Sequence, residues 1–166
     1  MDTTALRDAY RALLDAAATV ADASPTAAAD EWNADQVLAH VSIVNAVTIA
    51  AVGTISAGAN TNYDNRIALD TWTIERVLAR AGGNAGLRDR IRVQGEVLCA
   101  LAENALSETE LDTPVPTLLL SAGALLVDQL VPLRDLISGL ADVELPGHTE
   151  QLLALLPDTA MAAATA

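Results

Sequence analysis

The sequence predicts an all-α protein, specifically an antiparallel four-helix bundle with short extra helices. Hydrophobic residues make up 52% of the chain, yet aromatic residues make up only 2% and phenylalanine is absent. Such a core must be built from aliphatic residues and alanine, which favours close packing of helices. Apolar residues also recur at helical spacing along most of the chain, and no alternating strand pattern, Rossmann glycine pattern or P-loop competes.

Length and charge restrict the organisation and the partners of the chain. The 166 residues fit one helical domain over residues 1–157, followed by a tail at 158–166 that is expected to be disordered. The formal net charge of −13 opposes binding to nucleic acid or to an anionic membrane surface. No signal peptide or uninterrupted apolar run of about 18 residues is evident, so we expect a cytoplasmic protein.

The first two helices are expected at residues 3–22 and at about 34–56. The first has an apolar stripe opposite its charged residues. The second begins in "EWNADQVLAHV", where Asn33 suits an N-cap and Gln36 suits the third position of a capping box. Because this helix is apolar nearly all round, it is either central or covered on a second side by a partner chain, and we expect a homodimer.

Further helices are expected at residues 66–83 and 84–106, with Gly82 and Gly83 ending the first of them. Gly95 lies inside the second, where it costs about 1 kcal/mol relative to alanine, and this suggests close approach of another helix or a ligand. Residues 107–117 read as a crossover. The next residues, 118–120, are compatible with an extended conformation. From about residue 121 to 139 the spacing predicts a helix, followed by a loop and a short closing helix.

The chain has two histidines, and His40 is the main candidate for chemistry. His40 lies in the middle of the second helix among valines and should face inward, where it is either a satisfied core histidine or a ligand. His148 precedes the closing helix and reads as a surface or cap residue. Cys99 lies on an apolar helical face and reads as a small buried hydrophobe.

The segment "EWNADQVLAHV" resembles the DinB-like and mycothiol-dependent maleylpyruvate isomerase families, and "VQGEVLCALAENALSETELDTPVP" and "VDQLVPLRDLISGL" follow in the expected order. The resemblance covers most of residues 5–140. It implies a four-helix bundle, often dimeric. Many members bind a divalent metal through a histidine on the second helix and a Glu-x-x-x-His pair, closely followed by Asp-Leu, on the last helix. It also implies a thiol cofactor such as mycothiol.

Aligning Asp135-Leu136 with the end of that motif places Asp128 at the glutamate position and Pro132 at the histidine position. Proline has no lone pair for a metal. The resemblance therefore implies a degenerate site and no bound metal, unless a further carboxylate replaces the missing ligand and so allows zinc or nickel to bind. The candidates for that rescue are Asp64, Asp70 and Glu96.

Without a metal, His40 and Asp128 are expected to form an acid/base pair or a purely structural buried pair. Trp72 either packs in the core, which we favour, or lines the mouth of the bundle. The expected contacts to a small organic ligand are Thr48, Tyr63, Trp72, Arg92 and Gln129. Two functions fit these residues: an isomerase or transferase descendant, or a non-catalytic dimeric bundle that binds a ligand or a partner.

Overall fold

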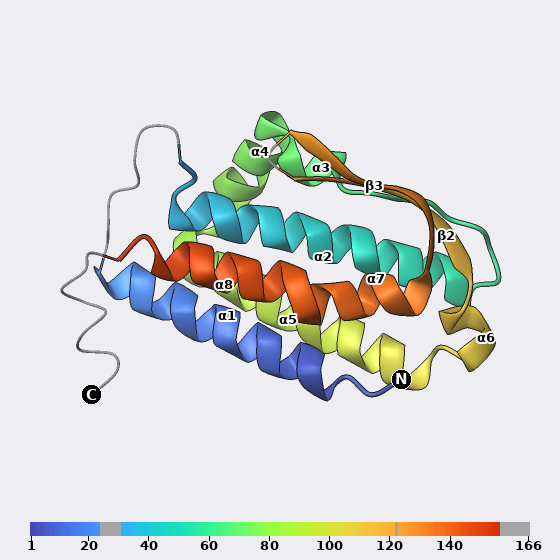
Figure 1. Ribbon diagram of the computed structural model, residues 1–166. Helices are drawn as coiled ribbons and strands as arrows, with labels where there is room; N and C mark the ends of the chain where they lie inside the picture. Colours follow the sequence, from blue (N-terminus) through green and yellow to red (C-terminus); the bar gives the residue numbers. More distant parts are fainter. Residues whose placement is uncertain (24–30, 122, 157–166) are drawn as a thin grey trace.

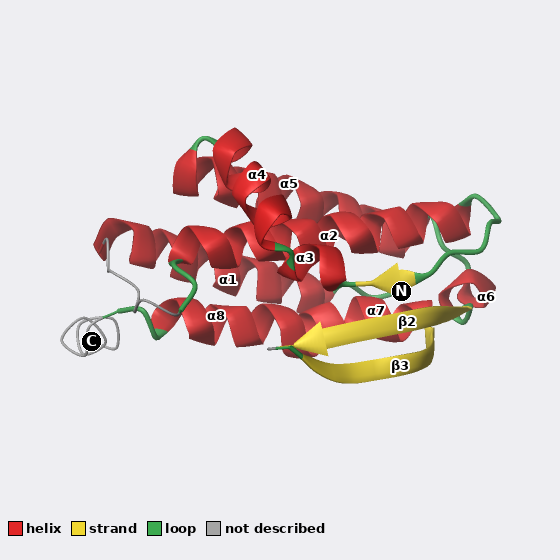
Figure 2. Cartoon of the chain, turned by 90° about the horizontal axis from the view of Figure 1, so that it is seen from above, coloured by secondary structure: helices red, strands yellow, loops and turns green. Residues whose placement is uncertain are grey.

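The computed structural model describes residues 1–23, 31–121 and 123–156 and is mostly helical, with a small three-stranded sheet. The expected tail at 158–166 lies outside the described residues. Figure 1 shows α1 (Thr4–Ala23), α2 (Ala34–Ser56), α5 (Gly83–Asn104) and the C-terminal helical run lying side by side. The sheet lies to one side of these helices (Figure 2).

Helix α2 is the central helix, and its start confirms the expected capping box. The Asn33 side chain accepts from the Gln36 amide at 3.0 Å, and the Gln36 side chain accepts from the Asn33 amide at 2.9 Å. Residues 37–45 are buried on every side. Among the described helices, only α2 is long and apolar enough to cross a membrane, but 67% of its apolar window is buried inside the protein. Its all-round apolarity therefore follows from its central position and needs no partner chain.

Helices α1 and α5 approach closely at Gly95, as the sequence suggested. A Cβ atom at Gly95 would lie 2.9 Å from Cδ2 of Tyr10, so only glycine leaves room for the tyrosine ring. The Tyr10 hydroxyl donates to the Asn45 side chain at 2.7 Å, which ties α1 to the central helix.

The single helix expected at residues 66–83 is divided into α3 (Arg66–Leu69) and α4 (Thr71–Ala81). Asp70 lies between them in an extended conformation, and its carboxylate accepts from the Thr73 amide at 2.8 Å as the N-cap of α4. Gly82 ends α4 in the left-handed conformation, as expected.

The sheet consists of β1 (Tyr63–Asp64), β2 (Pro114–Ser121) and β3 (Ala124–Pro132), in the order β1-β2-β3. β1 and β2 are parallel; β2 and β3 form an antiparallel hairpin that pairs Val115 with Val131 and Leu118 with Asp128. The helix expected from residue 121 is therefore wrong over this stretch. The leucines fit a helix by spacing, but the hairpin partner supplies the backbone hydrogen bonds.

Pro132 ends β3 and precedes α7 (Leu133–Gly139), so it interrupts no helix. It adopts an extended conformation, with φ −56° and ψ 142°, at the edge of the sheet, where its missing N–H costs little. After α7 the chain forms one π-helical stretch (Leu140–Glu144) and then α8 (Leu145–Leu153). The crossover expected at 107–117 contains the short helix α6 (Glu108–Leu111).

Candidate metal centre

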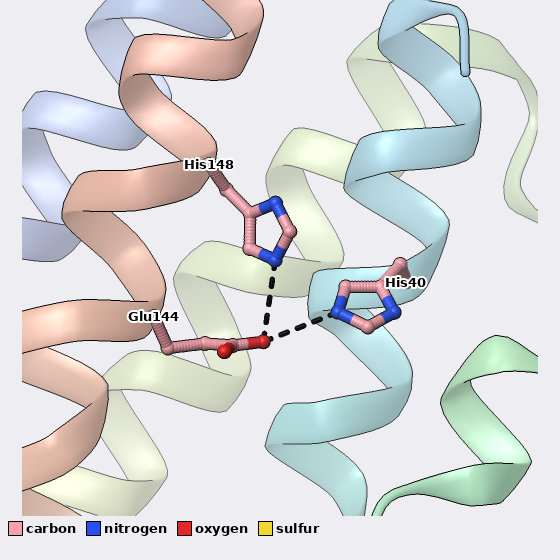
Figure 3. A group of neighbouring side chains, drawn as sticks. All are labelled: His40, Glu144 and His148. Atoms are coloured by element: carbon pink, nitrogen blue, oxygen red, sulfur yellow. Dashed lines mark hydrogen bonds and ion pairs between the residues drawn. The ribbon is translucent and has the colours of Figure 1, made fainter. Parts of the chain in front are cut away.

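Three side chains from two distant parts of the chain meet between α2 and the C-terminal helical run (Figure 3). His40 comes from α2, Glu144 ends the π-helical stretch, and His148 lies one turn further on in α8. Oε1 of Glu144 lies 3.1 Å from Nε2 of His40 and 3.2 Å from Nε2 of His148. Figure 3 shows both rings directed toward this one carboxylate.

The far side of each imidazole faces an oxygen that accepts a hydrogen bond from the ring. Nδ1 of His40 donates to the carbonyl oxygen of Ala68 at 2.8 Å, and Nδ1 of His148 donates to Oε1 of Gln151 at 2.9 Å. A neutral histidine protonated at Nδ1 has a lone pair at Nε2. Two lone pairs and a carboxylate oxygen therefore point at one another, which requires either protonated rings or a cation bound among them.

The geometry and the donor set fit a divalent transition metal. The ligand atoms of the three residues lie within 4.8 Å of one another. Metal–nitrogen bonds of about 2.0–2.1 Å place neighbouring ligand atoms about 2.9 Å apart in an octahedron and about 3.3 Å apart in a tetrahedron. The two separations from Oε1 lie within this range. Two histidines and one carboxylate form a ligand set that zinc enzymes use.

The three side chains differ in their exposure to solvent. The His40 side chain is 5% exposed, that of His148 is 17% exposed, and that of Glu144 is 31% exposed. Solvent therefore reaches the cluster mainly at Glu144.

Mutual electrostatic effects stabilise the charged forms of Glu144 and His148. Burial raises the pKa of Glu144, but hydrogen bonds from His148 and His40 outweigh it and lower the pKa to about 2. Burial lowers the pKa of His148, but the hydrogen bond and charge of Glu144 outweigh it, so the pKa is raised. The carboxylate is thus ionised at neutral pH, as a metal ligand must be.

Aromatic rings pack around His40. The ring centroid of Trp32 lies 5.1 Å from that of His40, and the His148 ring meets His40 edge-on with centroids 4.8 Å apart. Trp32 is partly buried against the core. Trp32, directly before the N-cap of α2, therefore forms one wall of the cluster.

Asp128 and Pro132 do not take part in this cluster, and the expected pairing of His40 with Asp128 is corrected. Asp128 is exposed in β3 opposite Leu118, because the segment forms a hairpin strand instead of a helix facing α2. The carboxylate that meets His40 is Glu144. Because Pro132 ends β3 and does not occupy a ligand position, it does not make this site degenerate.

The structure brings together two of the expected ligand contacts and separates the others. Thr48 and Tyr63 are buried, and their hydroxyl oxygens lie 2.9 Å apart. Trp72 is 62% exposed, with the guanidinium of Arg76 4.4 Å from its ring centroid, so the preferred core packing is wrong. Arg92 forms surface ion pairs with Asp89 and Glu96, and Gln129 is exposed in β3.

The three proposed rescue carboxylates are engaged elsewhere. Asp64 pairs with Arg66, Asp70 caps α4, and Glu96 pairs with Arg92. A shallow, open surface hollow is lined by Asp64, Arg66, Ile67, Asp70 and Thr73. It includes none of the three clustered residues, so it is not the site described above.

The expectation that His148 is a surface or cap residue before the closing helix is wrong, because it lies within α8 with its side chain 17% exposed. Glu144 was not selected from the sequence, although "ELPGH" contains a Glu-x-x-x-His spacing. Pro146 and Gly147 within it read as loop residues, which hid the helix. The structure accommodates Pro146 in the first turn of α8, directly after the wider π-helical stretch. The spacing itself was the signal that would have found the pair.

The chain matches no family model, no curated protein and no solved structure.

Proposed function

We propose that this protein binds one divalent transition metal, zinc or nickel, through His40, Glu144 and His148, and acts on a small organic molecule beside Glu144. One observation carries the proposal: two imidazoles, each bonded at Nδ1 to an acceptor, direct Nε2 at the same carboxylate oxygen. A cation bound among the three atoms resolves the repulsion of their lone pairs.

The resemblance stated above supports the same function if the family's Glu-x-x-x-His pair is aligned with Glu144 and His148 instead of Asp128 and Pro132. A histidine on the second helix and a Glu-x-x-x-His pair on the last helix correspond to His40, Glu144 and His148. The family's Asp-Leu does not follow closely after His148, where the chain has "TEQLL". The side-by-side long helices support an antiparallel four-helix bundle of the DinB-like kind. We propose a thiol such as mycothiol as the cofactor. We also propose a cytoplasmic location.

When bound, such a metal supplies a Lewis acid that polarises a carbonyl or lowers the pKa of a bound thiol or water. The chain's own residues hold and shield it. His40 from α2 and His148 from α8 present Nε2 as ligand atoms, and the Glu144 carboxylate balances part of the charge. Trp32 covers the His40 side, so a substrate enters on the more exposed Glu144 side.

Calorimetric titration of chelator-treated protein with zinc tests this proposal. We expect one ion per chain, with affinity reduced more than about 100-fold in His148→Ala and Glu144→Gln, because each variant removes a direct ligand. Glu96→Gln is the matched control, since its carboxylate pairs with Arg92 on the surface. Weak binding of wild type, equal to that of the two ligand variants, would reject the metal centre.

A second function, non-catalytic self-association, is favoured by the exposed edge of the sheet. β3 is an edge strand, and it exposes Leu125, Leu126 and Leu130 by about 60% each. Antiparallel pairing of two β3 strands is compatible with a two-fold axis, so the partner we propose is a second copy of the chain. Light scattering that gives one chain per particle for wild type would exclude it; a dimer lost in Leu126→Asp with Leu130→Asp would support it.

A further inference from the structure

Gln151 is the side chain that holds the outer nitrogen of His148. It lies three residues further along α8, on the same face, with Oε1 2.9 Å from Nδ1 of the histidine. The corresponding acceptor at His40 is the backbone carbonyl of Ala68. The acceptor for His40 is present whatever residue stands at position 68, because it is a backbone carbonyl. The acceptor for His148 depends on the identity of one exposed side chain, that of Gln151.

We propose that Gln151 is a positioning residue that prepares His148 to bind a metal, an inference that rests on the proposed metal centre. An acceptor at Nδ1 keeps the ring proton there, leaves the lone pair on Nε2 and fixes the plane of the ring. Gln151 itself is bonded to the outer edge of the ring and is not one of the three ligating residues. It acts through His148 alone.

A glutamine at this position has a property that a carboxylate lacks. Rotation of its amide by 180° presents NH₂ to Nδ1, and the ring proton then moves to Nε2, where it donates to Glu144. Gln151 can therefore pair with His148 in either tautomer, and only the carbonyl orientation permits metal binding. A glutamate at 151 accepts in both orientations and holds His148 in the binding tautomer permanently.

Three single variants separate this role from a general effect on α8. Gln151→Leu removes the acceptor at similar size, and Gln151→Glu restores a fixed acceptor. Glu150→Leu is the matched control, because Glu150 is the exposed neighbour and its side chain has no bond to another described residue. Zinc affinity is measured by competition with a chromophoric chelator, and the ring tautomer by ¹H–¹⁵N correlation spectra of the two histidines.

We expect Gln151→Leu to bind zinc about 10–100-fold more weakly than wild type, the usual loss when a metal-bound histidine loses its outer partner. Gln151→Glu should bind at least as tightly as wild type, and Glu150→Leu should be unchanged. In zinc-loaded wild type and Gln151→Glu, both histidines should be protonated at Nδ1.

Other outcomes overturn the inference and distinguish its failure from that of the metal centre. If wild type binds zinc and all three variants bind equally well, the metal centre stands and the role of Gln151 is rejected. If Gln151→Leu and Gln151→Glu are weakened equally, or the loaded His148 is protonated at Nε2, Gln151 has only a structural role. If wild type binds no zinc, both proposals fall.

Discussion

Gly95 is the residue on which the contact between α1 and α5 depends. The Tyr10 ring occupies the space where a side chain at position 95 would start. The same tyrosine donates to Asn45, which has no exposed surface. One missing methyl group thus allows α1 to reach the central helix that carries His40.

Gly95→Ala should lower the free energy of unfolding by about 1–3 kcal/mol, because its Cβ forces the Tyr10 ring from its place. Gly53→Ala is the control within a helix: nothing lies within 4 Å of its Cβ, so it should stabilise by about 1 kcal/mol. Urea denaturation of both variants measures the difference. Equal effects of the two substitutions would show that the helices do not meet at Gly95.

The two tyrosines of the chain are both buried, and this predicts a response to alkaline pH. Burial raises the pKa of Tyr63 to about 12, against the opposing effect of its bond with Thr48, and burial raises the pKa of Tyr10 further. Since the folded pKa values exceed the unfolded value of 10.0, the associated stability is present below pH 10 and is lost as pH rises toward 12.

Ultraviolet titration should therefore show no tyrosinate in the folded protein near pH 10, while urea-unfolded protein ionises there. Tyr63→Phe should reduce the loss of stability between pH 10 and 12. Ionisation of either tyrosine near pH 10 in folded wild type would mean that its hydroxyl is exposed to solvent.

At the scale of elements, the two residues that meet His40 of α2 come from the C-terminal helical run and not from the segment around Pro132. Asp128 and Pro132 lie in β3, and Pro132 is the last residue of that strand. A ligand pair four residues apart converges on one ion in a helix, whereas in an extended strand the same spacing separates the side chains along one face.

Pro132→His and Asp128→Ala test this assignment. Neither substitution should change zinc affinity, because neither position meets His40, and a histidine at 132 adds no ligand to the site. The measurement is the calorimetric titration used for the ligand variants. A gain in zinc affinity of more than about 10-fold in Pro132→His, or a loss of zinc affinity in Asp128→Ala, would contradict this assignment. Either result would indicate that residues 128–132 form a helix facing His40.

The sequence predicts helices well where local signals are strong. It fails where the conformation of a segment depends on pairing with a segment distant in sequence. The capping box at Asn33 and the left-handed glycine at 82 are local, and both were found correctly. The β2–β3 hairpin depends on pairing between strands, which leucine spacing does not reveal. His40 was selected by its inward position on α2, but Glu144 and His148 were obscured because Pro146 and Gly147 resemble a loop.

At the scale of the whole molecule, the proposed metal joins parts of the chain that are far apart in sequence. His40 and Glu144 are 104 residues apart, and they connect the central helix to the last helical run. A ligand that binds only the folded state adds stability in proportion to the logarithm of its concentration. A metal bound at the proposed centre therefore also links these two parts and stabilises the fold.

Zinc at about 100 times its dissociation constant should raise the free energy of unfolding by about 2.7 kcal/mol in wild type. A chelator should reverse the effect, and His148→Ala should show almost none at the same zinc concentration. Thermal unfolding followed by circular dichroism checks this. An equal gain in wild type and His148→Ala would place the stabilising ion elsewhere on this acidic chain.

Anomalous X-ray diffraction from crystals grown with zinc tests the central claim most directly. The proposed centre predicts one strong anomalous peak about 2.0–2.1 Å from Nε2 of His40 and of His148, with a Glu144 oxygen at about 2.0–2.2 Å. The Nδ1 atoms should keep their bonds to Ala68 and Gln151. A fully ordered site with no peak among these three residues, or a peak bound only by surface carboxylates, would contradict it.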